Sequence, residues 1–481
     1  MPHIFELLVV LLGGIPKSGY MNHISKVLRD YPGTRWAMML LVSFLMAANY
    51  FFYDVLSPLK ATLQEHLNMS SQDYGIIVGF YAFPNTFLLM AILGGIILDK
   101  LGIRPTGFLF AVFMLIGASL TAYGASDYFH QGGIGYKFMS SFLTGYSPEV
   151  KMMSLGMLIF GLGAETSIVV TSKILVKWFK GYEIALAFGI NLALARIGTA
   201  LAFVLPESMA QAFNYTTPVW FGVMLLLIGF LGFLIYMMYD IKLDRQVKDS
   251  ERLLSKDEEF HFSDLKKLFT NRSFLFITAL CVTFYAAVFP FLKYAPDFIY
   301  HKYGISRETA GLVASFLPFG TVVFTPLFGL FVDKIGKSAS MMIYGSVMLI
   351  IIHLLFGLTG FNPYVLMILL GIAFSLVPAA MWPSVAKIVP EARIGTAYGA
   401  MFSLQNLGLF AVPILAGTIL DSTNPGVTPE MIEAGAQLNY TPTILMFVIF
   451  GVLGVIFAFL LKWDDKHSGY GLELPSNSKE N

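Results

Sequence analysis

The apolar residues of this chain are gathered into twelve long runs, and the length of these runs constrains the fold more than any other feature of the sequence. Each run has at least about 18 residues, and at 1.5 Å per residue a helix of that length crosses the ~30 Å hydrocarbon core of a bilayer. Only 13% of the residues are charged, about half the fraction in soluble proteins. We therefore predict an all-α membrane protein with twelve transmembrane helices, at residues 36–57, 74–98, 104–125, 152–177, 183–206, 217–239, 273–297, 308–332, 339–359, 363–389, 394–420 and 441–462.

The basic residues predict how this bundle is oriented. Of the 31 Lys and Arg residues, 23 fall in the segments that share a side with the N-terminus. Five lie in the opposite loops and three within the spans. Because basic residues concentrate on the cytosolic side of membrane proteins, both termini are predicted to face the cytosol. The net charge of +1 gives no reason to expect a nucleic-acid partner.

Two sequence repeats divide the spans into six and six. GGIILDKLGIR, residues 94–104, recurs as GLFVDKIGK at 329–337, and AFGINLALARIG, residues 187–198, recurs as AYGAMFSLQNLG at 397–408. Repeats of this kind predict two pseudo-symmetric halves. The predicted parts are an N-terminal cytosolic or interfacial segment 1–35, an N-terminal half 36–239, a cytosolic linker 240–272, a C-terminal half 273–463 and a cytosolic tail 464–481.

The first repeat lies at the predicted cytosolic ends of the second and third spans of each half. Its glycines allow close helix packing, and its charged residues can pair across the interface between the halves. We interpret it as a gate and stabilising contact rather than a substrate site, formed by Asp99, Lys100, Arg104, Asp333 and Lys334. The pattern G-x-x-x-D-K-x-G, present twice in register, resembles the signature of the major facilitator superfamily.

Two opposite charges lie near the middle of adjacent spans. Glu165, in FGLGAETSIVV, and Arg196, in ALARIG, lie at equal distances along their helices from the turn between them, about 23 Å at 1.5 Å per residue. A lone charge at this depth costs at least ~2.5–3.5 kcal/mol. We favour a water-filled cavity in which Glu165 and Arg196 hold the two ends of a zwitterion. A purely structural salt bridge is the alternative.

The repeat also assigns counterparts to this pair. An offset of 210 residues maps Glu165 onto Ser375 and Arg196 onto Asn406, so the second half offers neutral hydrogen-bonding groups where the first half is charged. A structural pair needed by both halves would be expected to recur in both. We therefore include Ser375 and Asn406 in the candidate substrate site.

Other polar or aromatic residues within the spans have two interpretations each. Asp54 is a candidate cavity-rim or coupling residue, or a helix-end residue. Tyr285 and Trp382 lie at cavity depth, where packing is the alternative role. Lys293, near the outer end of its span, is expected to snorkel toward the interface.

A closer resemblance rests on nine motifs. They are FYD at 52–54, FPN at 83–85, GLGAETS at 161–167, WFKG at 178–181, FGINLALARIG at 188–198, AVFPF at 287–291, FGLFVDKIGK at 328–337, MWPSVAKIVPEARIGTAYG at 381–399 and SLQNLGL at 403–409. With them the chain resembles the major facilitator superfamily domain-containing protein 1 family, whose animal members are lysosomal dipeptide uniporters. The resemblance covers most of residues 44–420.

The resemblance implies a secondary transporter that moves short peptides, dipeptides above all, by alternating access of its two halves. It implies that Glu165 faces the peptide amine and that Arg196 holds the carboxylate, with Asp54 and Trp382 at cavity positions. The chain departs from the family at Lys293, where no charge is expected, and in lacking an acidic dileucine signal near its N-terminus. We expect residence in a bacterial inner membrane, with a lysosomal membrane as the alternative.

Partners follow from the same reasoning. Insertion 126–151 lies on the face where the animal proteins meet an accessory subunit, so that partnership is not transferred, and a monomer in contact with membrane lipid is expected.

Metal-ligand spacings, nucleotide-binding loops and catalytic triads are not found in the sequence, so neither an enzyme nor a cofactor is predicted. Two other functions stay open: a carrier of single amino acids or other organic zwitterions or anions, and a non-transporting scaffold or sensor.

Overall fold

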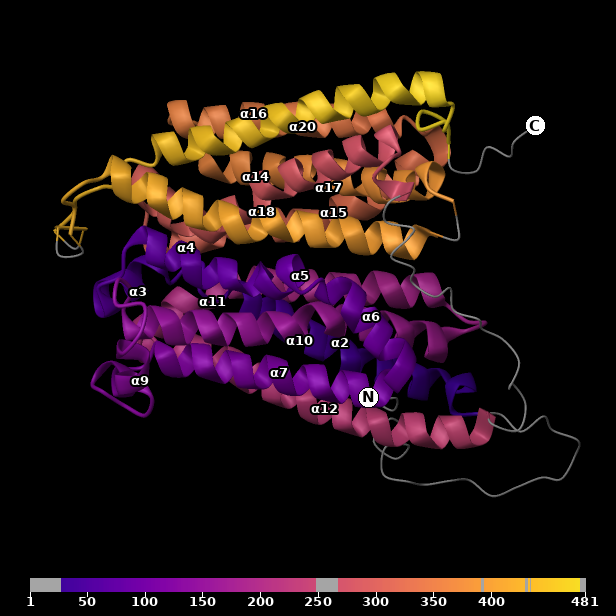
Figure 1. Ribbon diagram of the computed structural model, residues 1–481, viewed down its shortest axis with the longest axis horizontal. Coiled ribbons are helices and arrows are strands. Elements are labelled where there is room, and N and C mark those ends of the chain that lie inside the picture. The colour runs from indigo at the N-terminus through magenta and orange to yellow at the C-terminus, as the bar shows by residue number, and fades with distance from the viewer. Residues whose placement is uncertain (1–26, 248–266, 391–392, 429–430, 433, 476–481) are drawn as a thin grey trace, which may run out of the picture.

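The structure, a computed structural model, describes residues 27–247, 267–390, 393–428, 431–432 and 434–475 (Figure 1). Within these ranges all regular structure is helical, and eleven helices are long and apolar enough to cross a membrane. A twelfth span consists of two helical segments with a bend between them. The prediction of an all-α membrane protein with twelve transmembrane helices is confirmed.

The helices form two halves. The spans of the N-half are α2 (Pro32–Asp54), α4 (Ser71–Gly79) with α5 (Phe83–Phe87) and α6 (Met90–Leu101), α7 (Ile103–Gly124), α10 (Pro148–Phe179), α11 (Ile184–Ala212) and α12 (Thr217–Val247). Those of the C-half are α14 (Arg272–Tyr303), α15 (Arg307–Ile335), α16 (Ser338–Leu358), α17 (Pro363–Ile388), α18 (Ile394–Thr423) and α20 (Thr441–Ser468). Shorter helices are η1 (Leu28–Asp30), η2 (Phe80–Ala82), α3 (Lys60–Leu67), α8 (Asp127–His130) and α9 (Tyr136–Ser140).

The second span differs from the single helix predicted at 74–98. The helical segment that ends at Phe87 and helix α6 are bent by 59° relative to each other. Pro84 has no N–H group to continue the helical hydrogen bonds of α4, and Leu89 takes the left-handed conformation at φ 52°. The chain therefore changes direction at Leu88 and Leu89, directly after the helical segment that carries the FPN motif.

The two halves stack as separate blocks, with α18 and α15 of the C-half facing α4, α5 and α11 of the N-half (Figure 1). Helix α2 begins and α20 ends at the same end of the molecule. We name this end the cytosolic end, after the predicted orientation, and the opposite end the outer end. The orientation itself stays a prediction.

Glycines allow the halves to approach closely at the outer end. A Cβ atom on Gly75 of α4 would lie 2.3 Å from the carbonyl oxygen of Pro413 in α18. A Cβ atom on Gly311 of α15 would lie 2.3 Å from the carbonyl oxygen of Phe203 in α11. Any larger residue at either position would push the helices apart, so both helix pairs depend on these glycines for their spacing.

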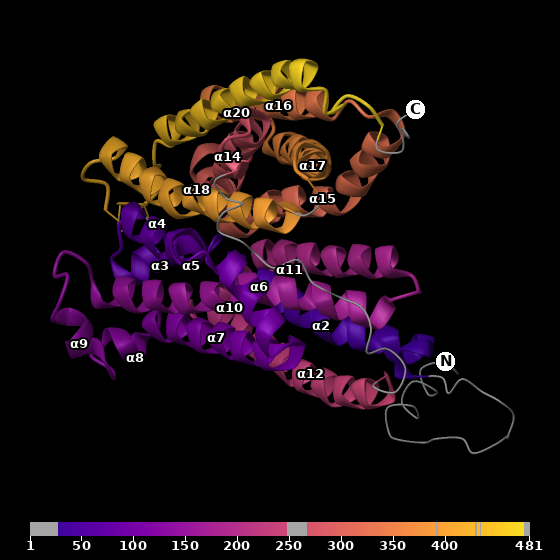
Figure 2. The ribbon, with the colours of Figure 1, turned by 45° about the vertical axis from the view of Figure 1, so that its right-hand side comes forward.

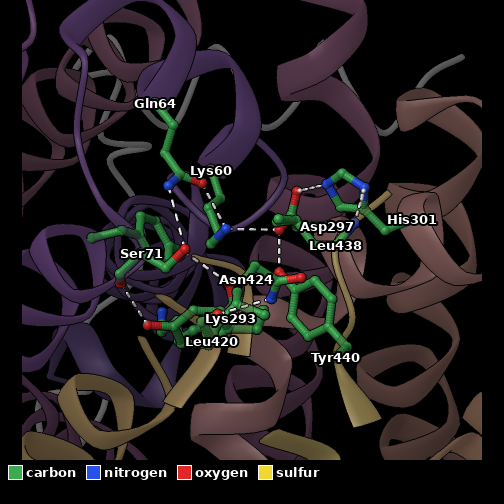
Figure 3. Close-up of polar contacts among 12 residues, drawn as sticks. Lys60, Gln64, Ser71, Lys293, Asp297, His301, Leu420, Asn424, Leu438 and Tyr440 are labelled. Carbon is green, nitrogen blue, oxygen red and sulfur yellow. Dashed lines mark hydrogen bonds and ion pairs between the residues drawn. The ribbon is translucent and has the colours of Figure 1, made fainter. Parts of the chain in front are cut away.

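Charged residues join the halves at the same end. We call this group the outer seal; it consists of the ion pairs Asp54–Lys293, Lys60–Asp297 and Glu65–Arg307, each with one member from either half. The Lys293 Nζ to Asp54 Oδ1 and Lys60 Nζ to Asp297 Oδ2 distances are both 2.7 Å. Lys60 points at Asp297 from α3, and Tyr440 donates to the same carboxylate (Figure 3).

The cytosolic end has no comparable ties. No hydrogen bond or ion pair between two described residues joins the halves there. Figure 2 shows α15 rising away from α11 toward this end. In the described part of the chain, the polar connections between the halves therefore lie at the outer end, which is an inward-facing arrangement for the predicted orientation.

Part of the predicted cytosolic tail is folded against the C-half. Beyond α20, residues 469–475 form a segment that we call the tail strap. Leu472 is fully buried, and the Glu473 carboxylate accepts hydrogen bonds of 2.8 Å from both the backbone N–H and the hydroxyl of Ser340 in α16. Lys387 of α17 donates to the carbonyl oxygen of Leu474 at 2.8 Å. The strap thus ties the cytosolic ends of three helices together.

The predicted linker 240–272 is shorter than expected. Helix α12 continues to Val247, because Asp240 is buried against Lys177 and Trp178 of α10. Helix α14 begins at Arg272, where the Asn271 side chain caps it by accepting from the N–H of Phe274. Residues 248–266 of the predicted linker, and the part of the predicted interfacial segment before residue 27, lie outside the described residues.

Candidate functional site

A cavity of about 160 Å³ lies between the halves, on the cytosolic side of the outer seal. Its polar lining from the N-half consists of Asn49, Tyr50, Tyr53, Tyr81, Glu165 and Arg196. Its polar lining from the C-half consists of Tyr285, Trp382, Gln405 and Asn406. Ile168, Phe289, Phe402 and Leu409 complete it. The volume is below the ~300–1,000 Å³ of pockets for drug-sized ligands, so the cavity suits a small ligand.

Glu165 lies near the middle of α10 and makes one hydrogen bond with the described residues. Tyr81 donates from its hydroxyl to Glu165 Oε1 at 2.8 Å. The Tyr81 ring lies 4.2 Å from the ring of Tyr53, which in turn lies 3.4 Å from Nζ of Lys293. Glu165 is therefore connected through two tyrosines to the outer seal, and its second carboxylate oxygen is available to a ligand.

Arg196 of α11 has no hydrogen bond to another described residue. Its guanidinium carbon lies 5.8 Å from the ring centre of Tyr50 and 5.9 Å from that of Phe374, within the range of cation–π attraction. The five N–H groups of a guanidinium form a fork that fits a carboxylate with two parallel hydrogen bonds. Arg196 is thus a positively charged donor without an acceptor among the described residues.

Glu165 and Arg196 line the same cavity but do not pair with each other. No ion pair joins these two residues, both of which lie in the described part of the chain. A structural salt bridge, the alternative interpretation of their equal depth, is not present in this conformation. The cavity separates one negative from one positive group, as a site for a zwitterion requires.

Aromatic side chains form the wall contributed by the C-half. Trp382 donates from Nε1 to the Tyr285 hydroxyl at 3.1 Å, and its ring stacks on Phe402 at 4.7 Å. The hydroxyl hydrogen of Tyr285 remains available to a ligand. Asn406 lies beside this wall and donates to the carbonyl oxygen of Phe402 at 2.9 Å.

Two predicted site residues lie outside the cavity. Asp54 is 3% exposed and paired with Lys293 in the outer seal. Lys293, expected to snorkel, is instead buried against Tyr53 and Asp54. Ser375 is fully buried and donates to the Gly371 carbonyl oxygen at 2.8 Å. Ser375 is the counterpart of Glu165 in the repeat, but the repeat relates positions and not the directions of side chains.

The predicted gate residues do not pair across the two halves in this conformation. Asp99 pairs with Lys173, and Arg104 with Asp244 at 2.9 Å, all within the N-half. The side chains of Lys100, Asp333 and Lys334 make no hydrogen bond or ion pair with another described residue. Since no hydrogen bond or ion pair between described residues joins the halves at the cytosolic end, their expected role at a closed interface stays a prediction.

The sequence did not single out several lining residues. Asn49, Tyr50 and Tyr53 lie within one and a half turns of α2, on the cytosolic side of Asp54. Their spacing with Asp54 could have indicated a polar face on the first span. Tyr81 gave no such signal, because it lies in η2 and a chain with 15% aromatic residues offers many similar positions.

The comparisons with known proteins identify the family. The sequence profile of the Major Facilitator Superfamily matches residues 42–298 and 294–473. The chain belongs to the major facilitator superfamily. It is therefore a membrane transporter and not an enzyme.

Relatives of known function show which members of the superfamily this chain is similar to. The lysosomal dipeptide transporter MFSD1 of Mus musculus is 32% identical to this major facilitator over 428 residues, 86% of either chain. The Homo sapiens protein of the same name is 30% identical over the same length and the same share of each chain. The predicted resemblance is confirmed.

Solved structures support the fold. The nucleoside transporter NupG matches this major facilitator with a TM-score of 0.64 at 17% identity, covering 88% of this chain and 99% of its own. A D-xylose–proton symporter matches with a TM-score of 0.64 at 16% identity, covering 93% of this chain and 99% of its own. At these identities the likeness concerns the fold alone.

Proposed function

We propose that this major facilitator carries short peptides, dipeptides above all, and that Glu165 binds the peptide ammonium while Arg196 binds the carboxylate. The observation that carries the proposal is that both side chains line one small cavity without pairing with each other. A zwitterion that fits between them satisfies both charges at once. The dipeptide transporters among the relatives support this choice of substrate class.

We further propose that the carrier works by alternating access. The outer seal lies directly beyond Tyr53, which lines the cavity. Release of a ligand toward the outer side therefore requires the three ion pairs of the seal to separate. The gate residues of the repeated motif, Asp99 and Asp333 among them, then close the cytosolic end in the outward-open state.

Uptake into proteoliposomes tests the proposal. Radiolabelled Ala-Ala is offered to vesicles containing the wild-type protein, with vesicles containing Glu165→Gln as the control. We expect saturable uptake that unlabelled Ala-Ala inhibits. N-acetyl-Ala-Ala and Ala-Ala-amide each lack one charged terminus, and we expect them to compete at least about tenfold less well, because charge-assisted hydrogen bonds contribute ~1.5–3 kcal/mol.

The alternatives give different results in the same vesicles. Saturable uptake of alanine without uptake of Ala-Ala would identify a carrier of single amino acids. No flux of either compound would favour a scaffold or sensor. Blocked peptides that compete as well as free ones would contradict the roles assigned to Glu165 and Arg196.

We also propose that both termini face the cytosol and that the protein resides, as a monomer, in a bacterial inner membrane. The distribution of Lys and Arg supports the orientation. A C-terminal alkaline phosphatase fusion tests it, because this enzyme is active only outside the cytosol. We expect an inactive fusion, and an active one would reverse the assignment of the cytosolic and outer ends.

A further inference from the structure

Asn406 lines the cavity and carries a hydrogen-bond acceptor that has no partner among the described residues. Its side chain is 2% exposed, and its amide Nδ2 donates to the Phe402 carbonyl oxygen at 2.9 Å. This bond fixes which end of the amide is free. The Oδ1 atom is buried and has no hydrogen-bond partner among the described residues. A buried acceptor left unsatisfied costs ~1–3 kcal/mol, so Oδ1 is prepared for a donor that arrives with the ligand.

Its neighbour Gln405 offers the complementary group. Gln405 Oε1 accepts from the buried thiol of Cys281 at 3.4 Å, which leaves Nε2 as the free end of this amide. Nε2 makes no hydrogen bond with another described residue, and Gln405 lines the cavity. The side chains of consecutive helical residues project about 100° apart around the helix axis. The two amides therefore face different edges of a ligand that lies against α18.

The geometry points to Gln405 and Asn406 as the residues that recognise the peptide bond of the substrate. This inference rests on the proposed function. Asn406 Oδ1 accepts from the peptide N–H, and Gln405 Nε2 donates to the peptide C=O. The N–H and C=O of a trans peptide unit point to opposite edges of one plane, which matches a donor and an acceptor that diverge from one helix.

Recognition of the peptide bond by Gln405 and Asn406 discriminates between dipeptides and single amino acids. A free amino acid has an ammonium for Glu165 and a carboxylate for Arg196 but lacks the peptide N–H that donates to Asn406 Oδ1. A site built to hydrogen-bond a substrate N–H discriminates strongly against an analogue that lacks it. The selectivity therefore comes from the C-half, while the charged termini are bound by the N-half.

A single-atom change in the ligand tests the inference. In L-alanyl-L-lactate an ester oxygen replaces the N–H of Ala-Ala, and both charged termini remain. Binding of the two compounds to the purified protein is measured by calorimetry. We expect wild type to bind Ala-Ala at least about tenfold more tightly than the ester or alanine, since the ester oxygen cannot donate to Asn406.

Variants locate the origin of this preference. Asn406→Leu should bind Ala-Ala and the ester within about twofold of each other, whereas Asn406→Asp, which keeps an acceptor, should retain the preference. Ser403→Ala is the matched control, because Ser403 is a buried polar residue one turn earlier on α18 outside the cavity lining. It should keep the wild-type ratio.

Each result has one meaning. Wild-type protein that binds Ala-Ala and the ester within twofold would overturn the inference and leave the proposed function standing. A preference that survives in Asn406→Leu would also overturn it. Absence of both binding and uptake of Ala-Ala would overturn the proposed function itself. If Asn406→Leu does not fold, the comparison of ligands on wild type alone still decides.

Discussion

Glu165 and Arg196 occupy one cavity as separate charges, and this separation determines what their substitution should do. Breaking a buried structural pair costs ~3–5 kcal/mol because a charge is left without its partner. Here no such pair exists to be broken, since the Glu165 carboxylate is held by Tyr81 and the Arg196 guanidinium by aromatic rings. Substitution of Glu165 or Arg196 should therefore impair ligand binding while leaving the stability of the ligand-free protein nearly unchanged.

The first prediction concerns Glu165→Gln and Arg196→Lys. We expect each ligand-free variant to melt close to wild type. The rise in melting temperature on adding Ala-Ala should be lost, because stabilisation by a ligand follows RT ln(1 + [L]/Kd), about 2.7 kcal/mol at a hundredfold excess over Kd. Differential scanning fluorimetry measures both quantities. A large loss of stability in the empty protein with ligand stabilisation intact would mean that Glu165 serves the fold.

The second prediction concerns the buried cation of the outer seal. Lys293→Met leaves the Asp54 carboxylate buried without its partner, and we expect a loss of ~3–5 kcal/mol in the free energy of unfolding. The double variant Asp54→Asn with Lys293→Met should recover much of that loss. Lys302→Met on the same helix is the control, because Lys302 is only half-buried and bonds to a backbone carbonyl. Equal effects at both lysines would contradict a special role for Lys293.

At this scale the sequence signals a buried charge more clearly than a neutral group. A carboxylate or guanidinium inside an apolar run is conspicuous, so hydropathy and helix geometry together are enough to assign Glu165 and Arg196 to one cavity. The position of Asp54 depends on Lys293, which lies 239 residues further along the chain, and no local pattern links the two. Tyr81 was missed because an aromatic residue is as common in packing as in a site.

At the scale of helices, the interface at the outer end depends on the absence of side chains. The third prediction is that Gly75→Val prevents the seal from closing, because a Cβ atom there would lie 2.3 Å from the Pro413 carbonyl oxygen. Gly189→Ala is the control, since a Cβ at Gly189 meets nothing within 4 Å. We expect Gly75→Val to shift the protein toward an outward-open state and to lower uptake at least about tenfold.

Thiol labelling reports this shift. A cysteine introduced at Ile414, which lies on α18 at its contact with Gly79 of α4, becomes accessible from the outer side when the halves separate there. The native Cys281 is fully buried and gives little background. Unchanged labelling in Gly75→Val would show that the helices accommodate the larger side chain without opening.

The fourth prediction concerns the tail strap. Leu472 is fully buried and Leu474 is 56% exposed, so the strap supplies its own control. We expect Leu472→Ser to lower the free energy of unfolding by ~2–5 kcal/mol, as for other truncations of buried leucines, and Leu474→Ser to change it little. Thermal unfolding of the two variants measures the difference. Similar melting temperatures would mean that the strap does not stabilise the C-half.

The elements themselves were largely predictable, and for one physical reason. A bilayer requires apolar runs of a certain length, so the twelve spans follow from hydropathy alone. The bend of the second span and the course of the strap were not predictable, because both depend on contacts with distant segments. At Gly336, for example, the backbone of the strap passes so closely that a Cβ atom would lie 2.5 Å from the Leu474 carbonyl carbon.

At the scale of the whole molecule, the halves contribute unequally. The N-half supplies both charges of the cavity, and the C-half supplies an aromatic wall and two amides. Among the described residues, the polar ties between the halves lie at the outer end. In the proposed transport cycle, ligand exchange in this conformation occurs at the cytosolic end, and the opening of the seal completes the cycle.

The cavity carries one negative and one positive side chain, and this balance has an electrical consequence. A zwitterionic dipeptide adds no net charge, so its passage should move almost no charge through the membrane field, whereas a surplus elementary charge changes the energy by ~2.3 kcal/mol per 100 mV. Imposed potassium-diffusion potentials should therefore leave the uptake of Ala-Ala unchanged and accelerate or retard that of Lys-Ala according to sign. A voltage-dependent Ala-Ala flux would mean that an ion travels with the peptide.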